Sequence, residues 1–158
     1  MKNNIQTIQL LIQNKKFNAV IKILDNSREQ DYEKNQYNYL KGFSYLNLND
    51  YKNAIKYFNL AIEIDDKNPT FYFYRGLIFS KINEYQKTID DFKKIIFLKP
   101  DSAEIYNNIA QIYYISGNNE ESIEKYLKSI ELKKSEKKSY IGLLWVLSKT
   151  KNFDYNKS

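Results

Sequence analysis

Paired carboxylates are the side chains of this sequence with the clearest capacity for chemistry. They occur at Asp65-Asp66, Asp90-Asp91 and Glu120-Glu121. Such pairs can act as general acid and base or bind a divalent cation. The chain has no histidine and no cysteine, however, so it lacks the commonest general base, the usual zinc ligands and any thiolate nucleophile. Its four glycines do not form a phosphate-binding loop pattern.

The positions of these acids suggest structural roles. Asp65-Asp66 lies in a polar break before a predicted helix, and Glu120-Glu121 opens another, where negative charge favours the helix dipole. Asp90-Asp91 is predicted mid-helix among lysines, which is typical of a solvated face. The sequence therefore predicts no catalytic residues, no metal site and no cofactor.

Composition gives a second set of expectations. Asn, Lys, Ile and Tyr make up about half of the 158 residues, which we interpret as the codon bias of a low-GC genome. The N-terminus lacks the apolar core of a signal peptide, and no apolar run reaches the roughly 18 residues of a membrane span. We therefore expect a cytoplasmic protein that makes no membrane contact.

A repeat of 34 residues organises the chain. When the sequence is shifted by this period, small, aromatic and aliphatic positions coincide without a gap. The clearest sets are Gly42, Gly76 and Ala110; Tyr45, Phe79 and Tyr113; Phe58, Phe92 and Tyr126; and Ile62, Ile96 and Ile130. Within each repeat the apolar spacing is helical, and polar breaks such as Asn49-Asp50 and Asn83-Glu84 divide it in two. Each repeat is thus predicted to be a pair of antiparallel helices that must stack on its neighbours.

These residues resemble the tetratricopeptide repeat, in which an aromatic, a small residue, Tyr, Ala, Phe and Pro recur over 34 positions. Residues 69–102 match with Tyr72, Gly76, Phe79, Tyr85, Phe92 and Pro100. The resemblance implies an all-α fold, an α-solenoid of stacked antiparallel helix pairs with a right-handed superhelix. The expected boundaries are 1–34 for a degenerate first repeat, 35–68, 69–102 and 103–136 for the next three, 137–150 for a C-terminal capping helix, and 151–158 for a tail or the start of a truncated helix.

The resemblance also implies a function, because the first helices of such repeats line a groove that binds a peptide or a helical segment of another protein. Carried over position by position, the expected groove residues are Tyr39, Phe43, Leu46, Phe73, Tyr74, Leu77, Asn107, Asn108, Gln111 and Tyr114. An exposed aromatic patch would mark an interaction site, and the amides could bond a peptide backbone. Alternatively, the aromatic side chains pack against adjacent helices, and the amides form an ordinary solvated face.

Lys41 and Arg75 occupy equivalent positions where the family usually has Leu. They could contact an anion or an acidic peptide. We favour snorkelling, in which the aliphatic stems cover the core and the charged groups reach water.

Other partners are weighed against this interpretation. The chain carries a net charge of +6, but most of the positive excess lies after the fourth repeat. The expected groove is poor in Lys and Arg, which disfavours binding of nucleic acid. An RNA-binding helical repeat is therefore the lowest alternative. Lys151-Asn152-Phe153-Asp154 matches the turn before a second helix. The alternative to a protein-interaction scaffold is therefore that the chain is the N-terminal repeat region of a longer enzyme or assembly factor, serving substrate recruitment or oligomerisation. Self-association through the terminal helix, with Trp145, is a further expectation.

Overall fold

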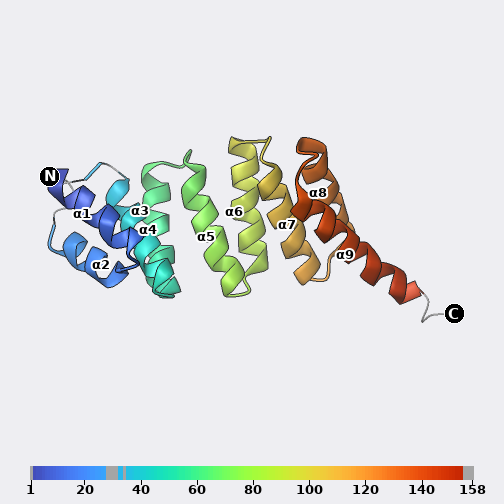
Figure 1. Ribbon diagram of the computed structural model, residues 1–158, viewed down its shortest axis with the longest axis horizontal. Helices are drawn as coiled ribbons and strands as arrows, with labels where there is room; N and C mark the ends of the chain where they lie inside the picture. Colours follow the sequence, from blue (N-terminus) through green and yellow to red (C-terminus); the bar gives the residue numbers. More distant parts are fainter. Residues whose placement is uncertain (1, 28–31, 34, 155–158) are drawn as a thin grey trace. The chain divides into compact units, whose positions relative to one another are not determined.

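The described part of the chain is built of α-helices alone. The computed structural model describes residues 2–27, 32–33 and 35–154, and these residues contain nine α-helices and no strand (Figure 1). The helices are α1 (Lys2–Gln13), α2 (Phe17–Asp25), α3 (Gln36–Asn47), α4 (Tyr51–Ile64), α5 (Pro69–Lys81), α6 (Tyr85–Leu98), α7 (Ala103–Ile115), α8 (Asn119–Leu132) and α9 (Lys137–Asp154). The prediction of an all-α fold built from helix pairs is confirmed.

One turn geometry recurs at the end of each first helix. Lys15, Asn49, Asn83 and Gly117 are spaced by 34 residues and all have a positive φ, of 55°, 60°, 62° and 84°. The amide that follows each of them donates to a carbonyl five residues earlier, for example from Asp50 to Tyr45 at 2.9 Å and from Glu84 to Phe79 at 2.8 Å. This is the hydrogen bond of a Schellman cap. The same turn therefore closes each first helix and starts the second.

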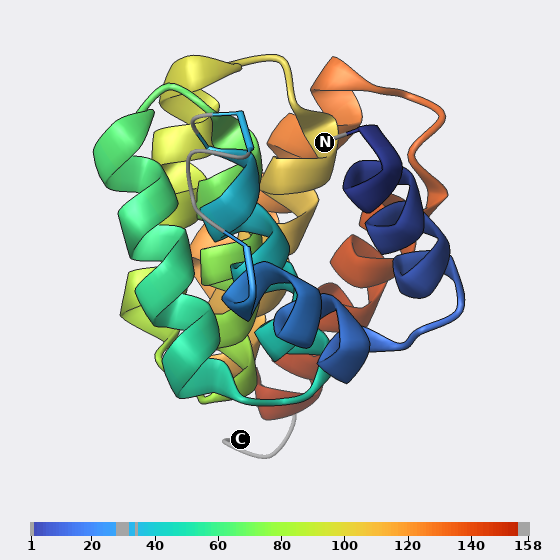
Figure 2. The same cartoon turned by 90° about the vertical axis from the view of Figure 1, so that its left-hand side faces the viewer.

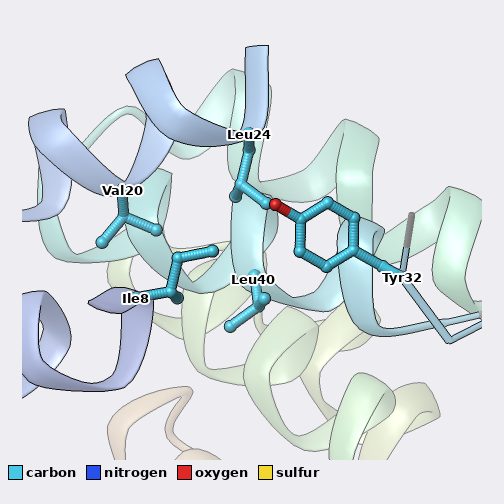
Figure 3. Packing of buried hydrophobic residues seen from close by; sticks show 5 residues of the cluster. All are labelled: Ile8, Val20, Leu24, Tyr32 and Leu40. Carbon is cyan, nitrogen blue, oxygen red and sulfur yellow. The ribbon is translucent and has the colours of Figure 1, made fainter. Parts of the chain in front are cut away.

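The chain divides into two compact units, residues 1–78 and 79–158. In the first unit α1 packs on α2, α2 on α3, and α3 on α4; the short loop that joins α1 to α2 is visible in Figure 2. Its core has two parts. One consists of Ile8, Val20, Leu24, Tyr32 and Leu40 (Figure 3), and the other of Ala54, Phe58, Ala61, Phe71 and Ile78.

In the second unit α6 packs on α7, α7 on α8, and α9 against both α7 and α8. Ala110, Tyr126 and Val146 form a buried cluster that joins the last three helices. Gly142 of α9 lies against the ring of Tyr126, and a β-carbon at this position would overlap that ring. The absence of a side chain at residue 142 thus permits the close approach of α8 and α9.

Two sequence-based expectations about this region differ from the structure. α9 is helical to Asp154, so the helix expected to end at residue 150 extends four residues further, and the turn expected at 151–154 is absent. Uninterrupted helix-compatible residues in that stretch, with neither Gly nor Pro, account for the difference. Residues 155–158 of the predicted tail lie outside the described part. Asp91, expected on a solvated face, is buried, whereas its neighbour Asp90 is exposed as expected.

Candidate functional site

The aromatic residues expected in the groove lie on α3 and α5 of the first unit. Tyr39, Phe43 and Leu46 come from α3, and Phe73, Tyr74 and Leu77 from α5, and all six side chains are half-buried. In α3 the three residues are spaced by four and three, and in α5 Leu77 lies four residues after Phe73 and three after Tyr74, so each set occupies neighbouring positions on its helix. Each of these side chains therefore packs partly against the interior of the unit and remains partly accessible to solvent.

Tyr39 is at the centre of this aromatic group. Its ring centroid lies 6.0 Å from that of Phe43 and 5.9 Å from that of Tyr74, and it also contacts the rings of the buried Phe58 and Phe71, at 6.5 and 6.1 Å. Tyr74 stacks on Phe58 with centroids 5.7 Å apart. Such edge-on and offset contacts stabilise aromatic clusters. Tyr39 and Tyr74 therefore each contact aromatic rings of adjacent helices while keeping part of their surface accessible.

Burial and the neighbouring Tyr74 raise the pKa of the Tyr39 phenol well above its usual range. The hydroxyl group is therefore neutral at physiological pH and remains a hydrogen-bond donor. This surface offers rings and a neutral hydroxyl group, which suit apolar side chains better than charged ones.

Lys41 does not reach water, contrary to the snorkelling that we favoured from the sequence. Its side chain is 6% exposed, and Nζ lies 2.6 Å from Oδ1 of Asp25 and 3.3 Å from the hydroxyl oxygen of Tyr57. The ammonium group also lies over the rings of Tyr37 and Tyr57, at 4.7 and 5.0 Å from their centroids. The physical reason is that Asp25 and the two rings replace the water that snorkelling would provide. Arg75 likewise donates from Nη1 to Oδ1 of Asn59 at 2.7 Å.

The expected groove amides line a polar cavity of about 680 Å³ in the second unit. Asn107, Asn108 and Gln111 of α7 contribute to its wall, as do Glu104 at the start of that helix and Lys138 at the start of α9. Cavities of this size are typical of ligand sites. The side chain of Asn108 is half-buried and that of Gln111 is exposed, and neither amide makes a side-chain hydrogen bond within the described residues.

Asn107 has a different environment from the other two amides. It is 3% exposed, and its Oδ1 accepts a hydrogen bond of 3.1 Å from the hydroxyl group of Ser139 on α9. The Ser139 hydroxyl oxygen lies 2.7 Å from that of Ser129, which donates to the backbone oxygen of Ala103 at 2.7 Å. A buried network of this kind rigidifies its surroundings when its groups are paired. Asn107 therefore forms the floor of the cavity and also joins α7 to α9.

Tyr114, the last expected groove residue, lies at the other end of α7. Its hydroxyl oxygen accepts a hydrogen bond of 2.8 Å from Nε1 of Trp145. Lys138 and Trp145 belong to α9, the helix that was expected to cap the repeats. They stand 34 residues after Glu104 and Gln111, so they occupy the corresponding positions of the repeat register.

The described residues offer little for metal chemistry. Among them, no group of three or more His, Cys, Asp or Glu side chains is arranged to hold an ion. Glu120 and Glu121 lie in the first turn of α8, as predicted. None of the helices in the described part has the length and apolar content needed to cross a membrane.

The segments that match a known protein family coincide with helix pairs of the structure. The family profile named Tetratricopeptide repeat matches residues 36–68 and 103–136, which contain the α3–α4 and α7–α8 pairs. These two segments are tetratricopeptide repeats. No match was found among curated protein sequences.

Solved tetratricopeptide structures share this fold at low sequence identity. MamA residues 41 to the end from Desulfovibrio magneticus RS-1 is 18% identical, with a TM-score of 0.84 over 98% of this chain and 87% of that one. YrrB, described as a TPR protein with an unusual peptide-binding site, is 15% identical, with a TM-score of 0.76 over 87% and 71%. The first TPR of Spaghetti (RPAP3), bound to the HSP90 peptide SRMEEVD, is 17% identical, with a TM-score of 0.68 over 75% and 94%.

Proposed function

We propose that this chain is a non-catalytic scaffold that binds an extended peptide segment of another protein, and that the polar cavity of the second unit is its main contact site. The observation that carries the proposal is the cavity of about 680 Å³ lined by Asn107, Asn108 and Gln111. Structures of similar fold support it, since one is bound to a peptide and another is described by its peptide-binding site.

The recognition chemistry follows from the amides. A primary amide offers a donor and an acceptor, which complement the carbonyl and N–H groups of a peptide bond. Because Asn108 and Gln111 make no side-chain hydrogen bonds within the described residues, binding a peptide backbone would not break existing ones. The cavity wall carries charges of both signs, from Asp101, Glu104 and Glu136 and from Lys133 and Lys138, so a partner residue of either charge finds a counterion there.

A direct test is to select binding peptides by display on the full chain and to measure their dissociation constants. We expect Asn108→Ala combined with Gln111→Ala to weaken a selected peptide at least about tenfold, because two backbone hydrogen bonds are lost. Gln86→Ala is the matched control, since Gln86 is an exposed amide on α6 that bonds Asp90 at 2.9 Å. Equal affinities for the wild type and the double variant, or a selection that yields no peptide, would contradict the proposal.

The aromatic surface of the first unit is a second proposed contact site, for apolar side chains of a partner. It consists of Tyr39, Phe43, Phe73, Tyr74 and Leu77, all half-buried. Phe43→Ala combined with Phe73→Ala should remove binding of a partner that uses this surface and retain the helical circular dichroism signal. Because Phe43 also contacts the rings of Phe17 and Tyr74, loss of the helical signal would instead assign these rings to the core alone.

A further inference from the structure

α9 exposes an apolar face that the second unit does not cover. Tyr140 is 42% exposed, Ile141 68%, Leu144 66% and Trp145 54%. The opposite side of the helix is buried through Ser139 and Val146. From residue 140 to 147 the sequence is YIGLLWVL, which has no charged side chain. A helical segment that is apolar around its whole circumference is normally buried on all sides. The exposed side of α9 is therefore a candidate contact surface for another molecule.

The charges around this face are of one sign. Lys137 and Lys138 precede it and Lys149 follows it; all three are exposed, and none has an ion-pair partner within the described residues. Lys149 lies over the ring of Trp145, 4.8 Å from its centroid. The acid nearest to the N-terminal end of α9, Glu136, is paired with Lys133 at 3.1 Å. Electrostatic complementarity therefore requires carboxylates on the partner, at both ends of its apolar stretch.

The repeat register shows what shape the partner must have. Leu144 stands at the position held by Gly42, Gly76 and Ala110 in the preceding repeats. At Gly42 an added β-carbon would lie 3.2 Å from the ring of Phe58 on the second helix of the same repeat. Leu144 would not allow an aromatic-bearing helix to come so close, but it can insert between the side chains of a helix that has a small residue opposite it.

From these observations we propose that the face formed by Tyr140, Ile141, Leu144 and Trp145 binds an amphipathic helix of another protein. The apolar stripe of that helix has a small residue at its centre and Asp or Glu at both ends. Lys138 borders both this surface and the polar cavity, but the four apolar residues do not line the cavity, and the proposal does not depend on peptide binding there.

Two other occupants fit the charges less well. A second copy of α9 would place lysines opposite lysines in either direction of pairing, which opposes the self-association expected from the sequence. An anionic bilayer is broad enough to approach α8 as well, which packs on α9 and exposes Glu120 and Glu121, whereas its Glu124 and Glu131 are paired with Lys125 and Lys128. A single helix along α9 avoids both repulsions.

Trp145 provides the measurement, because it is the only tryptophan in the chain and lies in the proposed contact. The probe is an 18-residue synthetic helix without tryptophan, with Leu at positions spaced by three and four, Ala at its centre and Glu at both ends. A matched probe carries Lys in place of each Glu. We expect the Glu probe to cause a saturable blue shift of Trp145 emission that weakens with salt, and to bind at least about tenfold more tightly than the Lys probe.

Ile141→Ser combined with Leu144→Ser should abolish this response without loss of helical content, since both side chains are exposed. Ile115→Ser, which changes an isoleucine that is 58% exposed at the end of α7, should leave it unchanged. The proposal is overturned by equal affinities for the two probes, by no shift at millimolar Glu probe, or by full binding in the double variant. A blue shift caused by phosphatidylglycerol vesicles but not by the probe, or by raising the concentration of the chain alone, would also overturn it.

Discussion

Lys41 joins three helices of the first unit through a single ammonium group. It lies on α3, and its partners Asp25 and Tyr57 belong to α2 and α4. Burial disfavours the charged form, but the hydrogen bonds that the ammonium group donates to Asp25, Tyr37 and Tyr57 outweigh this effect and raise the pKa of Lys41 above its usual range. Because the pKa is higher in the folded chain, this stabilisation is complete below pH about 10.4 and is lost as the pH rises through the folded pKa.

Removing one partner of this pair should be more harmful than replacing the lysine by an apolar residue. We expect Asp25→Asn to lower the free energy of unfolding by about 2 to 3 kcal/mol, because it leaves the ammonium group poorly paired. Lys41→Met should lower it by no more than about 1 kcal/mol, since Met fills a similar volume and half of the Asp25 side chain is already in water. Urea denaturation of both variants at pH 7 measures the difference, and the reverse order would show that the ion pair does not join these helices.

The left-handed position of the turn between paired helices allows Gly and Lys to be exchanged between two corresponding sites. Lys15 has a φ of 55°, where a side chain is strained, and Gly117 has a φ of 84° at the corresponding turn. A β-carbon added at Gly117 meets no atom within 4 Å, so the expected penalty is backbone strain. We expect Lys15→Gly to raise, and Gly117→Lys to lower, the free energy of unfolding by about 0.5 to 1 kcal/mol each. Thermal denaturation tests both, and a Gly117→Lys variant as stable as the wild type would contradict the turn geometry.

At the scale of the helices, the start of α4 is fixed by a side-chain cap that its counterparts lack. Asp50 accepts hydrogen bonds from the backbone N–H of Asn53 at 3.1 Å and from its side-chain amide at 2.7 Å. Glu84 and Asn118 occupy the same position before α6 and α8 and make no side-chain cap bond. The hydrogen bonds from Asn53 lower the pKa of Asp50.

Asp50→Ala should therefore lower the free energy of unfolding by about 1 kcal/mol, whereas Glu84→Ala, the matched control, should change it little. The effect of Asp50→Ala should be full above pH about 4 and diminish as the pH falls through the folded pKa, because the folded chain binds the proton less readily than the unfolded chain. Denaturation at pH 7 and pH 3 measures both effects. Equal losses in the two variants at pH 7 would show that the cap contributes nothing.

Most of the helices could be predicted because a strong signal marks each boundary. Asn49 and Asn83 stand at turns, Pro69 begins α5, and the apolar positions recur every three or four residues. The fate of individual polar side chains could not be predicted in this way. The burial of Lys41 depends on Asp25 sixteen residues away, and that of Asn107 on Ser139 in a later helix. Periodicity says which face a residue occupies, but not which distant group will pair with it.

At the scale of the whole chain, the two units offer different surfaces to partners. The first presents half-buried aromatic rings on α3 and α5, and the second presents the amide-lined cavity on α7 and the apolar face of α9. The sequence predicted the residue types of the first two surfaces through the repeat register. The sequence interpretation treated the terminal helix as a cap that could self-associate through Trp145, and it did not propose this helix as a binding surface for another protein.

Two-dimensional 15N–1H NMR of the 15N-labelled chain, titrated with a display-selected peptide, tests most directly whether the polar cavity is the peptide-binding site. Side-chain amide signals of Asn108 and Gln111, assigned from the spectra of Asn108→Ala and Gln111→Ala, should shift on binding because the peptide backbone becomes their hydrogen-bond partner. The signal of Gln86 should not move, and that of Asn107, which is bonded to Ser139, should move less than those two. Unchanged Asn108 and Gln111 signals at saturating peptide would contradict the assignment of this cavity as the peptide-binding site.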